Sequence, residues 1–324
     1  MLTTGGGRIW QDETKDSTMW SEDRYNAFMA RQAIDDEDLL RLESYTATIE
    51  PVDGSKREML HQLAMTVFWP HRGRDIDLFL RLGQGYVACD EIGRPLGSAM
   101  YFPMGPDFAM LGMMVVSPRL QSQGAGRRML RRIMRDCAGR DLRITSTRHG
   151  FRLYESAGFV PVSTIYQQQG IVREISAPAP TDGMLRDLTL ADRDAIVALD
   201  RSATHADRSA VFDALLEVSD GLVLEQDGEV KGFAMKRAFG KGTVIGPVLA
   251  DSDEMAIQLT APLLQSCEGR FARFDRQVES EAMGAFLAAA GLGVYDTVTE
   301  MRLGSNRLSQ EGLRVYGLAS HSLG

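Results

Sequence analysis

The sequence predicts an α+β protein of two tandem domains, each with a mixed, mainly antiparallel sheet flanked by helices. Three observations lead to this prediction. The chain has 324 residues, which is enough for about two domains. Hairpin signals alternate with helical patterns in both halves. The second half also repeats the order of elements found in the first.

The composition is that of a water-soluble globular protein, with 44% apolar and 25% charged residues. A net charge of −8 gives no general attraction to nucleic acid or anionic membranes. The longest apolar run, Phe108–Val116, is far short of the roughly 18 residues that span a bilayer. The three cysteines are too dispersed for a zinc site or a disulfide framework. We therefore expect a cytoplasmic protein with no membrane partner.

The first half divides into an extension and a domain. Residues 1–43 are rich in charge, and we expect them to be partly helical and partly disordered. Residues 44–176 form the first predicted domain. Helical periodicity and short apolar runs between turn residues give its elements in order: a helix at 56–68, strands at 86–90, 96–102 and 108–116, a helix at 124–137, a strand at 142–145, a helix at 151–156 and a strand at 159–166.

The segment at 177–183 reads APAPTDG, and its prolines and glycine mark a linker. The second predicted domain is 184–324. An Asp227-Gly228 turn joins two of its strands, because this dipeptide favours a tight hairpin. Its expected elements are strands at 222–226, 230–238 and 243–245, a helix at 255–267, a strand at 271–274 and a helix at 279–289.

Two short anchors support an internal repeat. Gly232-Phe233-Ala234-Met235 echoes Gly97-Ser98-Ala99-Met100, 135 residues earlier. Ala290-Gly291-Leu292 echoes Ala157-Gly158-Phe159, 133 residues earlier. The agreement of the two offsets favours one fold used twice. Chance similarity of common short peptides is the alternative.

The stretch Gln121–Gly126 carries the most informative chemistry. It lies between an apolar strand that ends before Pro118 and a predicted helix. Its glycines allow close approach of the backbone to a ligand, and the free N–H groups of a helix start favour a diphosphate. Neither the Gly-Lys-Ser/Thr loop nor a G-x-G-x-x-G loop after a strand fits.

The order Gln-x-x-Gly-x-Gly at 121–126 followed by Leu153-Tyr154-Glu155-Ser156-Ala157-Gly158-Phe159 resembles the GNAT superfamily of N-acetyltransferases. The whole chain is similar to a tandem subgroup of that superfamily, in which the C-terminal GNAT-like domain is degenerate. The resemblance covers about residues 46–303. It implies two tandem GNAT-like domains, of which the first is catalytic.

The resemblance also implies a site for acetyl-CoA as acyl donor, with no metal. Thr147 and His149 stand where many members have an asparagine-containing turn. The implied cofactor-binding residues are Met114, Val115, Val116, Gln121, Ser122, Gln123, Gly124, Ala125, Gly126, Arg127, Thr147 and His149. In the repeat, carboxylates at 251, 253 and 254 replace the loop and Leu287 replaces Tyr154, so we expect one cofactor site per chain.

In this family an amine attacks the thioester directly. Backbone N–H groups of residues 114–116 would then meet the oxyanion, and Tyr154 would return a proton to the thiolate. Tyr154 could instead be a packed aromatic residue. His71 is a candidate general base, or a surface histidine. His205, Asp207 and Arg208 either face the acceptor across the domain junction or form a salt-bridge cluster at a helix start.

We therefore expect an acyl-CoA-dependent N-acyltransferase that transfers acetyl to an amine of a small molecule or peptide. Two alternatives remain at this stage. One is a non-catalytic acyl-CoA-binding regulatory protein, and the other is an aminoacyl-tRNA-dependent transferase. The acidic net charge argues against the second, because it offers no broad basic surface for nucleic acid. The chain could be oligomeric.

Overall fold

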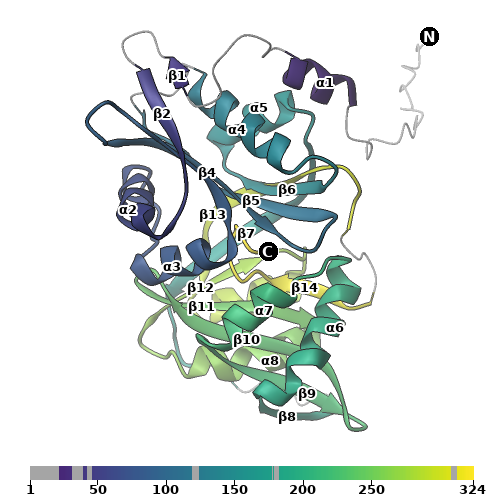
Figure 1. Cartoon of the computed structure of the whole chain (residues 1–324). Helices are drawn as coiled ribbons and strands as arrows, with labels where there is room; N and C mark the ends of the chain where they lie inside the picture. The colour runs from purple at the N-terminus through teal and green to yellow at the C-terminus, as the bar shows by residue number, and fades with distance from the viewer. Residues whose placement is uncertain are drawn as a thin grey trace, which may run out of the picture.

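The computed structural model describes residues 22–30, 39–41, 46–118, 124–176, 178, 182–307 and 312–324 (Figure 1). It confirms the α+β class. The elements of the first half are α1 (Glu22–Ala30), β1 (Leu39–Arg41), β2 (Thr46–Pro51), α2 (Arg57–Thr66), α3 (Gly73–Leu82), β3 (Gln84–Cys89), β4 (Pro95–Pro103), β5 (Phe108–Val116), α4 (Ala125–Asp136), β6 (Asp141–Ser146), α5 (Arg148–Ser156) and β7 (Val160–Ile171).

The second half begins with β8 and ends with a short strand close to the C-terminus. Its elements are β8 (Met184–Asp187), α6 (Arg193–Thr204), α7 (Ser209–Leu216), β9 (Ser219–Gln226), β10 (Glu229–Phe239), β11 (Gly242–Ala250), α8 (Asp253–Gln265), β12 (Phe271–Arg276), α9 (Glu281–Ala289), β13 (Gly293–Leu303) and β14 (Arg314–Gly317). The linker prediction at 177–183 falls largely outside the described residues, and it stays a prediction.

All the described strands belong to one sheet, in the order β1-β2-β3-β4-β5-β6-β13-β7-β12-β14-β11-β10-β9-β8. The two halves exchange strands at its centre (Figure 1). β13 of the second half pairs with β6 and β7 of the first, and β7 pairs on its other edge with β12. No local pattern indicated this exchange, because a strand shows the same alternation whichever neighbour it has.

Turn chemistry explains the predicted hairpins, which are confirmed. Asp227 and Gly228 both have positive φ, of 52° and 78°, as a two-residue hairpin turn requires. In the β3–β4 turn the Asp90 carboxylate accepts hydrogen bonds from the backbone N–H groups of Ile92 and Arg94, at 3.1 and 2.8 Å. These local bonds stabilise each turn independently of distant contacts.

The first predicted helix is shorter than expected, and a second helix follows it. α2 ends at Thr66, and Phe68 adopts a positive φ of 59° just before Pro70. α3 then begins after Arg72, whose backbone N–H donates to Asp75 Oδ2 at 2.7 Å. We did not predict α3, and the strands β1, β2, β8, β13 and β14 and the helices α6 and α7 were missed as well.

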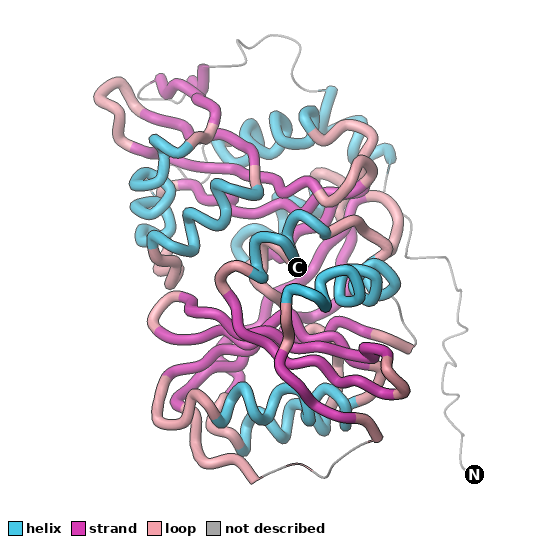
Figure 2. The backbone as a smooth tube through the Cα atoms, turned by 60° about the horizontal axis from the view of Figure 1, so that its bottom comes forward, coloured by secondary structure: helices cyan, strands magenta, loops and turns pink. Residues whose placement is uncertain are grey.

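The two halves share a central apolar core. Phe79 packs on Phe102 in the first half, with ring centroids 5.4 Å apart, and Phe212 packs on Phe233 in the second at 5.6 Å. All four side chains belong to one buried cluster. α4 and α5 cover the outer face of the first half, and α8 and α9 cover that of the second. The C-terminus lies between the halves (Figure 2).

The extension contributes one helix that docks on α4. Phe28 of α1 is buried, and the Arg131 guanidinium lies 4.8 Å from its ring centroid. Arg131 Nε also donates to the Phe28 carbonyl at 2.7 Å. Part of residues 1–43 is therefore helical, as expected. The expectation of disorder concerns residues outside the described ones.

Candidate active site

The predicted diphosphate cradle lies at the start of α4. Gly124 caps this helix with a φ of +83°, and a Cβ there would meet nothing within 4 Å. Its backbone conformation rather than space therefore favours glycine. The first turn of α4 carries no acidic side chain, so its N–H groups present an unopposed positive end to an anion. Gln121, Ser122 and Gln123 lie outside the described residues, and their role stays a prediction.

Small residues let the start of α4 approach its neighbours. Ala125 is buried. A Cβ on Gly126 would lie 3.4 Å from Leu153 Cδ2 and 3.5 Å from Val116 Cγ2. α4 therefore rests against both β5 and α5. Arg127 follows, and its guanidinium lies 5.5 Å from the Phe28 ring centroid, so α1 already contacts the residue predicted to meet the diphosphate.

The strands β5 and β6 diverge toward this helix start. Their parallel pairing runs from Phe108↔Asp141 to Leu111↔Ile144. The next residues of β6, Thr145 and Ser146, pair only with β13, which lines the other edge of β6 throughout. The backbone of Met114, Val115 and Val116 lies on the diverging part of β5, where the resemblance places the thioester.

A strained residue marks the point of divergence. Met113 has a positive φ of 48° at an irregularity in the β4–β5 ladder. Its carbonyl accepts a hydrogen bond from the buried hydroxyl of Ser98 at 2.7 Å. A non-glycine residue in this conformation costs about 1–3 kcal/mol, and such strain clusters at functional sites. Ser98 therefore helps to hold the irregular backbone at Met113.

Tyr154 points from α5 into the cluster that contains Leu111 and Ile144, the last pair before the strands diverge. Its ring packs against Phe159 at 5.9 Å, and only 5% of the residue is exposed. Burial raises the pKa of Tyr154 above its usual value, so the phenol is protonated at neutral pH. Gly150 makes room for the ring, because a Cβ there would lie 2.9 Å from Tyr154 Cε2.

The turn between β6 and α5 has a helix-capping role. The Thr147 hydroxyl accepts from the Gly150 N–H at 3.4 Å and caps α5, while His149 is exposed. Contact of either residue with a pantetheine arm stays a prediction. Sequence reasoning missed Thr145, whose buried Oγ1 has no hydrogen-bond partner among the described residues. No spacing singled out this threonine.

His71 is partly buried among three aromatic rings, with its Nδ1 atom shielded from solvent. The rings of Trp69, Phe79 and Phe239 lie 5.7, 5.4 and 5.5 Å from it. Burial, followed by the positive charge of Arg273, lowers the pKa of His71 to about 3. The imidazole is therefore neutral and weakly basic at neutral pH. The structure gives His71 a packing role, and we leave it out of the proposed catalytic residues.

In the second half, β11 and β12 diverge as β5 and β6 do, but another strand of the chain fills the space between them. β11 and β12 pair in parallel only at Thr243↔Ala272 and Val244↔Arg273. Beyond these pairs β14 lies between them, with Val248 opposite Gly317 and Arg276 opposite Gly317 on its other edge. A strand of the protein thus occupies the groove that would correspond to the cofactor groove of the first half.

The start of α8 is also closed to an anion. Ser252 caps the helix, and Asp253 and Glu254 lie in its first turn. The Tyr316 hydroxyl of β14 donates to Asp253 Oδ1 at 2.7 Å. Leu287, which replaces Tyr154 in the repeat, is fully buried. These contacts support the prediction of one cofactor site per chain.

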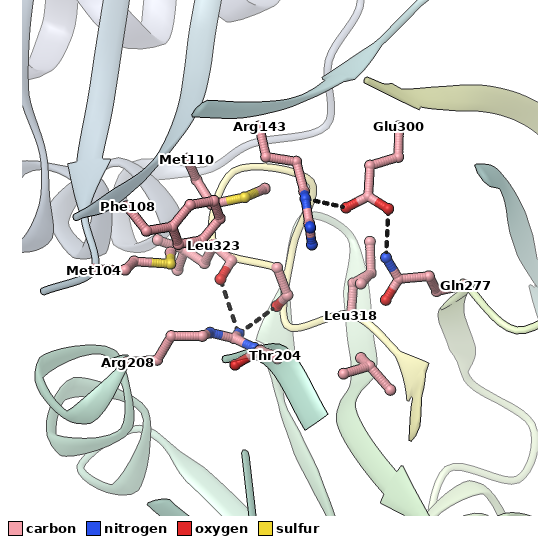
Figure 3. Close-up of a pocket in the computed structure, with 12 residues that line it drawn as sticks. Met104, Phe108, Met110, Arg143, Thr204, Arg208, Gln277, Glu300, Leu318 and Leu323 are labelled. Atoms are coloured by element: carbon pink, nitrogen blue, oxygen red, sulfur yellow. Dashed lines mark hydrogen bonds and ion pairs between the residues drawn. The ribbon is translucent and has the colours of Figure 1, made fainter. Parts of the chain in front are cut away.

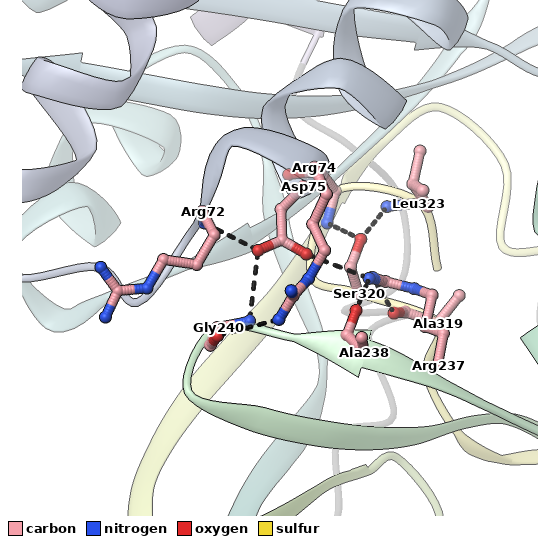
Figure 4. Close-up of polar contacts among 10 residues, drawn as sticks. Arg72, Arg74, Asp75, Arg237, Ala238, Gly240, Ala319, Ser320 and Leu323 are labelled. Atoms are coloured by element: carbon pink, nitrogen blue, oxygen red, sulfur yellow. Dashed lines mark hydrogen bonds and ion pairs between the residues drawn. The ribbon is translucent and has the colours of Figure 1, made fainter. Parts of the chain in front are cut away.

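A buried ion pair joins the two halves beside the shared core (Figure 4). The Arg237 guanidinium donates to Asp75 Oδ1 at 3.2 Å and to the Ala319 carbonyl at 3.1 Å. Asp75 Oδ2 also accepts from the Gly240 N–H at 3.2 Å. One carboxylate thus fixes the start of α3, the β10–β11 turn and, through Arg237, the C-terminal residues.

A second polar group lines a small pocket between the halves (Figure 3). Arg143 of β6 and Glu300 of β13 face it from the sheet, and Arg208 faces it from the start of α7. Arg208 Nη1 donates to Asp200 Oδ1 at 2.9 Å. The salt-bridge alternative fits Asp207, which accepts from the Ser209 N–H at 3.1 Å and pairs with Arg201. Arg208 lines the junction, and contact of this cluster with an acceptor stays a prediction.

The remaining candidate chemistry is structural. The three cysteines are free and buried, and burial raises the pKa of Cys137 to about 12, so its thiol is a poor nucleophile. Across the described ranges no group of His, Cys, Asp and Glu side chains is arranged to hold a metal ion. No helix in that same part of the chain is long and apolar enough to cross a membrane.

Family profiles match both halves. A profile described as an acetyltransferase (GNAT) domain matches residues 81–161, and another with the same description matches residues 196–317. The chain is a member of the GNAT acetyltransferase family. The second half is thus a GNAT domain by sequence, although its groove holds β14.

Known proteins are similar to this chain over most of its length. An uncharacterized N-acetyltransferase, YitH, of Bacillus subtilis (strain 168) is 25% identical over 266 residues, which span 79% of this chain and 91% of YitH. The fold matches a putative acetyltransferase from Pyrococcus horikoshii with a TM-score of 0.71 and 17% identity, covering 90% of this chain and all of that one. It also matches a tandem GNAT protein from the clavulanic acid biosynthesis pathway, with a TM-score of 0.56 and 15% identity over 79% of this chain and 98% of that one.

Proposed function

We propose that this GNAT protein transfers an acetyl group from acetyl-CoA to an amine, using only its first domain. The observation that carries the proposal is the contrast between its two grooves. In the first half, β5 and β6 diverge toward a glycine-capped helix whose first turn has no acidic residue. In the second half, β14 fills the groove, and Asp253 accepts a hydrogen bond from the Tyr316 hydroxyl.

The reaction needs a new C–N bond, cleavage of the C–S bond, loss of a proton from the amine and gain of one by the thiolate. Bound acetyl-CoA would supply the activated acetyl group. Gly124, Ala125, Gly126 and Arg127 would hold its diphosphate through backbone N–H groups and one guanidinium. The backbone of residues 114–116 would face the thioester oxygen.

Tyr154 is the proposed proton donor. Burial keeps its phenol protonated, so a proton is present when the thiolate departs. A thiolate with a pKa of about 8.5, by analogy with cysteine, is a weaker base than the tyrosinate. Tyr154 therefore stabilises the leaving group mainly by donating a hydrogen bond while the C–S bond breaks, and water completes the transfer. Because its lowered pKa makes His71 a weak base, the amine would lose its proton to water rather than to this ring.

Thiol release with an amine library tests the proposal. Wild-type protein should release coenzyme A with at least one amine. Tyr154→Phe should bind acetyl-CoA normally but lower kcat by about 10- to 100-fold, because the hydrogen bond to the departing thiolate is lost. Acetyl-CoA binding without thiol release from any amine would instead favour a regulatory acyl-CoA-binding protein. Salt-dependent binding of charged tRNA would favour an aminoacyl transferase.

A further inference from the structure

The helix α1 precedes the ranges that match the GNAT profiles, yet it packs against the cofactor half beside α4 and α5 (Figure 1). Its apolar face consists of Tyr25, Phe28 and Met29, which are three and four residues apart and pack in the cluster that also contains Tyr154. Nine residues are too few for a helix that is stable alone. Contact with the cofactor half therefore keeps α1 folded.

Arg131 of α4 anchors the end of α1. The Phe28 carbonyl is one of the last four in α1, so it has no partner within the helix. Arg131 Nε donates to this carbonyl at 2.7 Å, and a positive charge is favourable at the C-terminal end of a helix. Arg131 is only 6% exposed, so water competes little for the bond. This bond fixes the position of Phe28 relative to α4.

The Phe28 ring connects this anchor to the proposed cofactor cradle. The guanidinium groups of Arg127 and Arg131, one turn apart on α4, lie 5.5 and 4.8 Å from the centroid of the ring. Both distances are within the roughly 6 Å of a cation–π contact. Such a contact uses the flat face of a guanidinium and leaves the N–H groups at its edge available. Arg127 can therefore donate to an anion while it stays against the ring.

The N–H groups of Arg127 are available for a ligand. Within the described ranges Arg127 contacts the Phe28 ring but makes no hydrogen bond or ion pair. It lies in the first turn of α4, three residues after Gly124, so its donors can reach a diphosphate at the helix start. A mobile arginine side chain loses rotamer freedom when it binds a phosphate. Phe28 reduces this loss, because it restricts the side chain before the cofactor arrives.

The corresponding helix of the second half has no arginine at this position. Arg127 is the third residue of α4, and the third residue of α8 is Met255. Met255 is buried in the apolar cluster of the second half. The half whose groove is filled by β14 thus has an apolar side chain here, and the half with the open groove has an arginine. This contrast favours a role of Arg127 in cofactor binding.

We propose that α1 is a positioning element of the cofactor site, in which the Phe28 ring orients the Arg127 guanidinium toward the diphosphate of acetyl-CoA. The inference rests on the cofactor cradle of the proposed function and adds to it a residue from the N-terminal extension. Phe28 acts through Arg127 and takes no part in the chemistry. Docked α1 therefore strengthens cofactor binding.

Calorimetric titration of the full chain with acetyl-CoA tests this role in a double-mutant cycle. Phe28→Leu keeps an apolar side chain against α4 but removes the aromatic ring, and Arg127→Gln removes the guanidinium. Phe28→Leu alone should weaken binding by about 3- to 10-fold, the factor expected when one long side chain must be immobilised on binding. Added to Arg127→Gln, it should cause no further loss, because the ring then has no guanidinium to orient.

A control variant and a kinetic measurement separate orientation of Arg127 from packing of α1. Met29→Leu changes the neighbouring apolar contact of α1 and should keep the wild-type affinity. In thiol-release kinetics the effect of Phe28→Leu should appear in the KM for acetyl-CoA rather than in kcat. Unchanged affinity in Phe28→Leu, or an equal loss with and without Arg127, would overturn the inference. Tighter binding in Phe28→Leu would overturn it too, because α1 would then compete with the cofactor.

Failure of the role of α1 can be distinguished from failure of the proposed function. Absence of acetyl-CoA binding by the wild-type protein would overturn both. Wild-type binding that Phe28→Leu leaves unchanged would overturn only the role of α1. A loss in Phe28→Leu that depends on Arg127, without thiol release from any amine, would support the role of α1 and overturn the transfer reaction.

Discussion

Gly150 offers a way to displace Tyr154 without removing it. A methyl group at position 150 would lie 2.9 Å from Tyr154 Cε2 and 3.4 Å from Ser146 Oγ. Carbon atoms prefer about 3.5–4.0 Å, so the ring must move by roughly 0.5–1 Å. The ring cannot move freely, because it is buried against Phe159. Gly150→Ala should therefore shift the proposed proton donor.

The expected effect on stability is small because two contributions oppose each other. Overpacking costs about 1–3 kcal/mol. Alanine in place of glycine inside a helix stabilises the folded state by about 1 kcal/mol. The net loss in the free energy of unfolding should be about 0–2 kcal/mol. A displacement approaching 1 Å at a catalytic group can cost up to about 100-fold in rate, so kcat should fall by roughly 10- to 100-fold while acetyl-CoA binding persists.

Thermal unfolding, calorimetry with acetyl-CoA and thiol-release kinetics together check this prediction. Gly284→Ala is the matched control: Gly284 also lies in a helix, and the nearest atom to a Cβ there would be Arg276 Nη2, at 3.3 Å. This control should keep wild-type kcat. A Gly150→Ala protein with wild-type kcat would refute the assignment of Tyr154 as proton donor.

Three further predictions concern the surroundings of the site. His71→Phe should keep kcat and its pH profile. The folded-state pKa of His71 is about 3, below the usual value near 6.5, so the wild-type protein should lose stability as the pH falls from 6.5 to 3. Denaturant unfolding should show a smaller loss of stability over this range in the variant. Asp75→Asn should destabilise the protein by about 3–5 kcal/mol in denaturant unfolding, because it leaves Arg237 buried and unpaired, whereas replacing both residues by apolar ones should recover much of this loss. Tyr316→Phe should cost about 1–2 kcal/mol through loss of its bond to Asp253, without creating a second cofactor site detectable by calorimetry.

Local chemistry predicted much of the first domain and a hairpin of the second. The Asp227-Gly228 turn, the strand that ends before Pro118 and the glycine-capped start of α4 depend on neighbouring residues, so the sequence contains their cause. Tyr154 could be placed on a helix for the same reason. Its burial in the cluster beside the diverging strands depends on packing, and only the structure shows it.

Long-range features could not be predicted. β7 and β13, the strands that the halves exchange, show the ordinary alternation of apolar and polar residues. The sequence of a single strand does not indicate which strand it pairs with. The environment of His71 comes partly from Phe239 and Arg273 of the other half. The Arg143–Glu300 pair likewise joins strands from different halves. Each of these features arises from the way the halves fold together.

Titration of the protein with acetyl-CoA by calorimetry tests the central claim, a single working cofactor site at the start of α4. Wild type should bind about one molecule per chain in the micromolar range, and Gly124→Glu should lose binding because it adds a negative charge at the cradle. Gly139→Glu is the control, since Gly139 has nearly the same φ of +82°, equally open surroundings and a place just past the other end of α4. Binding lost only in Gly124→Glu would support the account. No binding by wild type, two molecules per chain, or unchanged binding in Gly124→Glu would contradict it.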